Sequence, residues 1–93
     1  MFGSWKLADM PTLTTMPQKA ASAFYGATEN LVGGNFEPVL FAGEQLVNGV
    51  NYCFYCKFNP VVQNPSTSFV KVIINTDLEG KNAKVISVQP ELN

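Results

Sequence analysis

The sequence predicts one α+β domain in which a single α-helix packs on a twisted antiparallel β-sheet of four to five strands. An amphipathic stretch with helical periodicity precedes several alternating strand patterns, which are separated by turn-forming residues. The chain has 93 residues, of which 46% are hydrophobic and 14% charged, as is typical of one folded domain. No repeat or linker divides it, so we expect residues 1–93 to form a single domain.

The first expected element is a short strand within residues 3–9. Trp5 and Leu7 alternate with other residues there, so the two-residue period of a strand places both on one face. We expect Trp5 to pack on this strand and not to bind a ligand. Pro11 and Pro17 bracket the Thr-rich connector that follows.

The second expected element is a helix from about residue 16 to 32. Thr15 and Gln18 have the spacing of a capping box, with a proline between them in the first turn. Gly33-Gly34 is a typical C-cap. The residues that recur at helical spacing are Ala20, Ala21, Phe24, Ala27, Leu31 and Val32.

The rest of the chain has the pattern of strands. The four expected strands are Phe36–Leu46, Val50–Phe58, Phe69–Asn75 and Ala83–Gln89. Pro38 and Gly43 indicate an edge position or a bulge in the first of them. Turns are expected at Asn48-Gly49, where a tight hairpin needs a positive φ, and at Asp77–Asn82. The helix then covers one apolar face of this sheet.

The Asn48-Gly49 turn is preceded by two apolar residues, Leu46 and Val47, which have no structural reason to lie at a solvated tip. Apolar side chains on a rigid turn are typical of a surface that a partner covers. A stray exposed apolar residue is the alternative interpretation. The pattern therefore indicates a hairpin that inserts into a partner.

Composition excludes several function classes. The net charge is −1 and the basic residues are six lysines without a cluster, which argues against nucleic-acid and membrane-surface binding. Histidine is absent, so we expect no metal, no cofactor and no His-activated nucleophile. Lys6 and Asp9 interrupt the N-terminus, which therefore lacks the apolar core of a signal peptide. We expect a cytoplasmic protein, although a processed secreted form would read the same way.

Cys53 and Cys56 have CxxC spacing, but they fall inside a strand and not at a helix N-terminus. The two-residue period sends them to opposite faces, so we expect Cys56 in the core, Cys53 outside and no bond between them. An enzyme would have to use Cys53 or a lone carboxylate without histidine. We therefore expect the protein not to be an enzyme.

The hairpin sequence Gln45-Leu46-Val47-Asn48-Gly49 resembles the QxVxG hairpin of the cystatins, in which Asn-Tyr commonly follows, as Asn51-Tyr52 does here. Gly3-Ser4-Trp5 and Met10-Pro11-Thr12 resemble the start of the stefins, the branch without signal peptide or disulfides. The order of one short strand, one helix and four strands is also similar. Phe69–Val72 and Leu78 resemble the third long strand and the second hairpin, so the resemblance covers nearly the whole chain.

This resemblance implies a cystatin-like fold and a reversible, tight-binding inhibitor of papain-like cysteine proteases. In that family an N-terminal segment and two hairpins form a wedge that fills the protease cleft. The residues that would form it here are Phe2, Gly3, Gln45, Leu46, Val47, Asn48, Gly49, Leu78 and Glu79. Phe2 would enter a non-primed subsite, and Gly3 would turn the chain away. A monomer is expected, with a domain-swapped dimer as the alternative state that the resemblance implies.

The second hairpin departs from the family pattern. Leu-Pro or Pro-Trp is usual there, whereas this chain has Leu78-Glu79, which places a charge where an apolar contact is expected. The alternative function is therefore a cystatin-fold interaction protein that does not inhibit and binds another partner through the Gln45–Gly49 hairpin.

Overall fold

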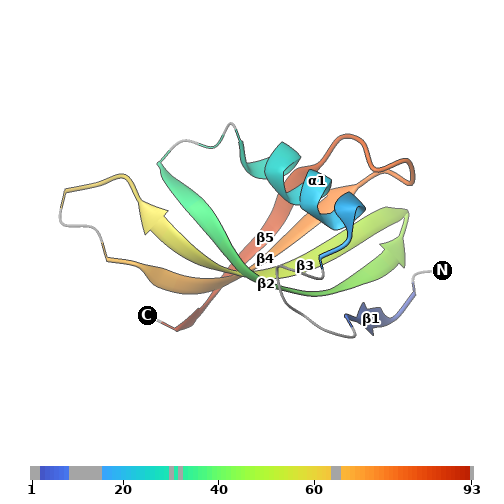
Figure 1. Ribbon diagram of the computed structural model, residues 1–93, viewed down its shortest axis with the longest axis horizontal. Helices are drawn as coiled ribbons and strands as arrows, with labels where there is room; N and C mark the ends of the chain where they lie inside the picture. The colour runs from blue at the N-terminus through green and yellow to red at the C-terminus, as the bar shows by residue number, and fades with distance from the viewer. Residues whose placement is uncertain (1–2, 9–15, 30, 32, 64–65, 93) are drawn as a thin grey trace.

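The computed structural model describes residues 3–8, 16–29, 31, 33–63 and 66–92. Within these residues, one helix packs on a five-stranded antiparallel sheet (Figure 1). The elements are β1 (Trp5–Leu7), α1 (Gln18–Thr28), β2 (Gly34–Val47), β3 (Gly49–Pro60), β4 (Ser68–Thr76) and β5 (Lys84–Leu92). The expected α+β class is confirmed, and the sheet has five strands.

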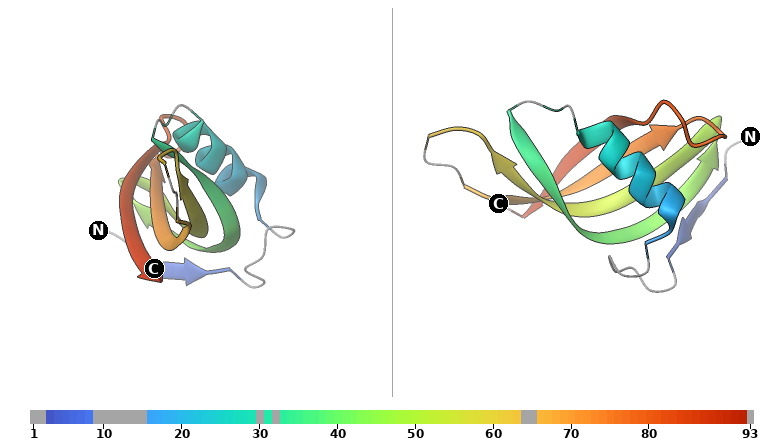
Figure 2. Two further views of the ribbon diagram at one scale, coloured as in Figure 1. Left: turned by 90° about the vertical axis from the view of Figure 1, so that its left-hand side faces the viewer. Right: turned by 45° about the horizontal axis from the view of Figure 1, so that its top comes forward.

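The sheet is a meander in which each strand pairs with the next one along the chain. It curls round α1, which lies across its concave face (Figure 2). The molecule is elongated, with extents of 43 × 26 × 24 Å, and β2, β3 and β4 continue past the helix at the end opposite the N-terminus (Figure 1). The helix α1 is the one described helix, and it is not long and apolar enough to span a bilayer.

The core forms where the inward residues of β3 and β4 meet the buried face of α1. Phe24 of the helix lies on Phe54 of β3, with ring centroids 4.9 Å apart. The buried core residues are Ala20, Ala23, Phe24, Phe41, Tyr52, Phe54, Cys56, Val70, Val72 and Ile74. Burial of each large apolar side chain among them contributes about 1.5–3 kcal/mol. The alternation in β3 therefore follows the two-residue period that the sequence predicts.

The helix is shorter at both ends than the expected residues 16–32. Its N-cap is Pro17, which has no side-chain oxygen and makes no capping bond, and Thr15 lies outside the described residues. At the other end the backbone N–H of Leu31 donates to the carbonyl of Thr28 at 3.2 Å, which turns the chain away. The expected Gly33-Gly34 C-cap is wrong, because Gly34 already belongs to β2.

The strands are longer than expected, because pairing continues beyond the apolar alternation. β2 contains register shifts between Pro38 and Leu40 and between Phe41 and Gly43, which confirms the bulges that its proline and glycine predict. β5 continues through Pro90, where the sequence predicts that it ends. An edge strand tolerates proline because only one of its sides needs backbone donors.

Candidate functional site

Three segments that are distant in the sequence meet at the end of the molecule where the N-terminus lies (Figure 1). We call them the N-terminal segment, which begins at Gly3 among the described residues, the first hairpin (Gln45–Gly49) and the second hairpin (Asp77–Asn82). The N–H of Gly3 donates to the carbonyl of Leu46 at 2.7 Å. The predicted site residue Phe2 lies outside the described residues.

The first hairpin is closed by the pairing of Val47 with Gly49, which leaves Asn48 at the tip. Gly49 has a φ of 125°, a conformation that favours glycine. The Leu46 side chain is 59% exposed, whereas Val47 is half-buried and Gly49 is buried. The turn therefore lies where the sequence predicts it, and it presents an apolar side chain to solvent.

The two hairpins lie side by side. Val50, just after the first hairpin, pairs with Thr76, just before the second. A Cβ atom built on Gly49 would collide with the carbonyl oxygen of Thr76 and would lie 3.5 Å from the Cα of Asp77. Gly49 therefore serves the close approach of the two hairpins as well as the turn itself.

A row of amide side chains fastens the N-terminal segment to the sheet. Gln45 donates from Nε2 to the carbonyl oxygen of Gly3 at 3.1 Å. Its Oε1 accepts from Nδ2 of Asn51 at 3.2 Å, and Oδ1 of Asn51 accepts from Nδ2 of Asn75 at 2.8 Å. The row thus links the N-terminal segment to β2, β3 and β4, and the Gln45 side chain at its start is half-buried.

The second hairpin is organised by the carboxylate of Asp77. Its Oδ1 accepts the backbone N–H groups of Glu79 at 3.0 Å and Lys81 at 2.8 Å, and its Oδ2 accepts Nδ2 of Asn82 at 2.9 Å. The N–H of Lys81 has the largest effect and lowers the pKa of Asp77. Desolvation, the second-largest effect, opposes it, and the Asn82 side chain and the N–H of Glu79 lower the pKa further. The ionised carboxylate therefore stabilises the loop.

The tip of the second hairpin carries an apolar and an acidic side chain together. Leu78 is 67% exposed, and the neighbouring Glu79 is also exposed. The structure thus brings Gly3, Leu46 and Leu78 to one end, as the sequence predicts for the three parts of the site.

The two cysteines lie on opposite faces of β3 and are free, as predicted. Cys56 is fully buried under the helix, and this burial, with a smaller effect of Cys53, raises the pKa of its thiol to about 12. Burial also raises the pKa of Cys53, against the lowering effect of the Lys71 ammonium. Both groups are therefore thiols at neutral pH, which suits packing better than nucleophilic attack. Among the described residues, no cluster of metal-ligating side chains is present.

Sequence reasoning missed the role of two asparagines and the position of Trp5. Asn51 and Asn75 join Gln45 only because the register of β2, β3 and β4 aligns them, and this register cannot be read from any one strand. Trp5, which we expected to pack, lies 39% exposed beside a hollow on the outer face of the sheet.

Comparison of the chain with protein-family models, with curated proteins and with solved structures finds no match.

Proposed function

We propose that this protein is a reversible, tight-binding inhibitor of papain-like cysteine proteases that occludes the active-site cleft. The observation that supports the proposal is the apolar end of the molecule, where Leu46 and Leu78 are exposed on adjacent hairpins beside Gly3. This arrangement is what the resemblance of Gln45–Gly49 to the cystatin hairpin leads us to expect. The expected cytoplasmic location is part of the same proposal.

Occlusion needs contact and no bond-making step. Leu46 and Leu78 would each contribute about 1.5–3 kcal/mol on full burial in a cleft. The amide row through Gln45 and the carboxylate of Asp77 already order the backbone that carries these side chains. Little conformational entropy is then lost on binding, and this favours affinity. Phe2 would approach a non-primed subsite and Gly3 would let the chain turn away, as the family resemblance implies.

The decisive experiment replaces the most central exposed contact. We expect Leu46→Asp to weaken inhibition of a papain-like protease by about 30-fold or more, because a charge enters an apolar cleft. Val61→Asp is the matched control, since Val61 is also exposed, at 77%, but follows the far end of β3. The measurement is the inhibition constant of each variant against papain. A wild-type protein that does not inhibit any of a panel of papain-like proteases at micromolar concentration overturns the proposal.

The second candidate function is an interaction protein of the same architecture that does not inhibit. The exposed carboxylate of Glu79 beside Leu78 favours it, because burial of an unpaired charge in an apolar cleft is unfavourable. Under this alternative, wild type and Glu79→Gln both fail to inhibit, whereas capture of a partner depends on Leu46. Under the inhibitor proposal, Glu79→Gln inhibits at least as tightly as wild type.

A further inference from the structure

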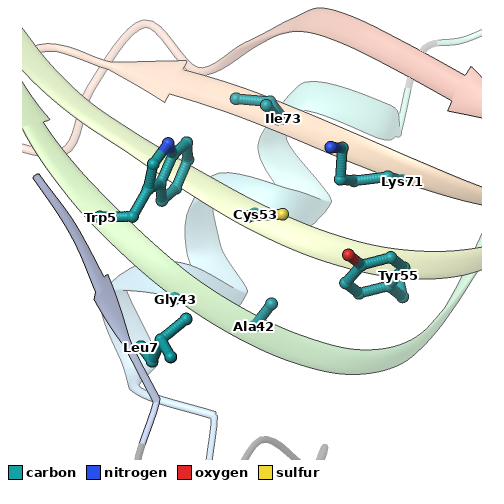
Figure 3. Close-up of a pocket in the computed structure, with 8 residues that line it drawn as sticks. All are labelled: Trp5, Leu7, Ala42, Gly43, Cys53, Tyr55, Lys71 and Ile73. Carbon is teal, nitrogen blue, oxygen red and sulfur yellow. The ribbon is translucent and has the colours of Figure 1, made fainter.

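The outer face of the sheet, away from the helix, contains a hollow of about 210 Å³ (Figure 3). One cross-strand row explains it, since Leu7 pairs with Gly43, Gly43 with Cys53, and Cys53 with Ile73. The two middle residues are small and leave a depression between the larger outer ones. Trp5 stands at the side of this depression (Figure 3).

The floor of the hollow is apolar in character. Cys53 is 8% exposed, and its free thiol is held protonated by burial. Gly43 presents backbone only, and the carbonyl of Lys6 passes so close to it that a Cβ atom would collide. Trp5, Leu7 and Ile73 supply the apolar walls.

Two polar side chains, Lys71 and Tyr55, lie together on the side of the hollow opposite Trp5, whose indole N–H is the other side-chain N–H of the lining. Lys71 and Tyr55 are register partners, and Figure 3 shows the ammonium of one and the hydroxyl of the other turned toward Cys53. The Tyr55 ring is held by stacking on Phe69, with centroids 5.8 Å apart. No carboxylate is among the residues that line the hollow. The charge of Glu91 contributes to the raised pKa of Cys53, but Glu91 is not part of the lining. The side with Lys71 and Tyr55 therefore suits an anion.

We infer that this hollow binds a small aromatic carboxylate, with its ring over Cys53 between Trp5 and Ile73 and its carboxylate toward Lys71 and Tyr55. The size agrees, because an apolar cavity of about 150 Å³ accommodates benzene. An apolar body with a few convergent polar groups is the usual pattern of a small-molecule site. The site lies on the outer face of the sheet and does not depend on the proposed protease inhibition.

The test uses two probes with the same body and different heads, 3-phenylpropionate and 3-phenylpropanamide. Trp5 is the only tryptophan of the chain, so its fluorescence reports on the wall of the hollow. A probe of this size in an open hollow should bind with a Kd on the order of a millimolar. We expect saturable quenching by the carboxylate and a roughly two- to five-fold weaker affinity for the amide.

Three variants separate this site from general surface binding. Lys71→Met should lower the affinity for 3-phenylpropionate roughly two- to five-fold and leave the affinity for 3-phenylpropanamide unchanged. Lys57 lies on the same face of β3 as Cys53 but outside the lining of the hollow. Lys57→Met should therefore leave the affinity for both probes unchanged. Cys53→Leu should fill the hollow and abolish binding of both probes.

Protection of Cys53 from iodoacetamide gives a second measurement, because the fully buried Cys56 should not react in the folded protein. We expect 3-phenylpropionate to slow the alkylation of Cys53 with the same Kd that fluorescence gives. Absence of saturation in both measurements overturns the proposal. Equal affinities for the two probes, or equal effects of Lys71→Met and Lys57→Met, also overturn it.

Discussion

At the scale of single residues, two separate constraints act on Gly49. Its φ of 125° and the nearby carbonyl of Thr76 both exclude a side chain. Gly80 provides the comparison, because its φ of 83° is also positive but nothing lies within 4 Å of an added Cβ atom. Gly49 therefore combines backbone strain and collision, whereas Gly80 has strain alone.

We predict that Gly80→Ala lowers the free energy of unfolding by about 1–2 kcal/mol, the usual cost of a left-handed backbone for a residue with Cβ. Gly49→Ala should lower it by clearly more, because the second hairpin must also move. Urea unfolding of the two variants measures the difference. Equal losses would show that the packing of the hairpins on Gly49 is not tight.

At the scale of elements, the second hairpin is held by three hydrogen bonds to the carboxylate of Asp77 and by two backbone bonds, from Asp77 to Lys81 and from Gly80 to Asp77. We predict that Asp77→Ala speeds hydrogen exchange at the amides of Glu79 and Lys81, which lose their acceptor, while the amide of Phe54 in β3 exchanges as before. Amide exchange followed by NMR measures this. Asp77→Asn is the conservative control, because its side-chain oxygen still accepts both bonds; if it speeds exchange as much as Asp77→Ala, the charge and not the geometry holds the loop.

The lowered pKa of Asp77 also determines how the order of the same hairpin depends on pH. The pKa of Asp77 in the folded loop is below its ordinary value of 3.8, so the stabilisation is present above that pH and is lost as the pH falls through the lower, folded value. We expect the amide exchange protection of Glu79 and Lys81 in wild type to persist at about pH 5. The loop should then stay ordered in mildly acidic solution. Loss of protection at these two amides under that condition would contradict the role given to Asp77.

Local patterns predict the elements well where burial and periodicity agree. β3 is predicted by the alternation of Tyr52, Phe54 and Cys56, and all three are buried. The helix is predicted too long because Leu31 continues the apolar spacing, although the pairing of Gly34 with Pro60 draws the chain into β2 a few residues later. Tertiary pairing decides the ends of elements, and helical periodicity does not contain that information.

At the scale of the whole molecule, the meander explains why the predicted site residues meet. β2 and β3 share one turn, β4 and β5 share another, and antiparallel order places both turns at the end where β1 begins. The sequence predicts the apolar tips directly. It does not predict the amide row or the hollow over Cys53, because both arise from the cross-strand register and from the position of β1 on Gly43.

The core of the whole molecule also contains a titratable group, which makes global stability sensitive to alkaline pH. Cys56 has an ordinary pKa of 9.0 and a folded value of about 12, because the helix and sheet exclude water from its thiol. A raised folded pKa means that the stabilisation is complete below pH 9.0 and is lost as the pH rises toward the folded value. The unfolded chain ionises first and is stabilised by doing so.

We predict that Cys56→Ala is less stable than wild type at pH 7, because it leaves a small cavity in the core. The difference should shrink as the pH rises above 9.0, since only wild type loses the contribution of this thiol. Tyr52 and Cys53, whose pKa values burial also raises, titrate in both proteins, so their own contributions largely cancel in the comparison. Urea unfolding of both proteins at several pH values measures the difference, and a constant difference would mean that water reaches Cys56 in the folded state.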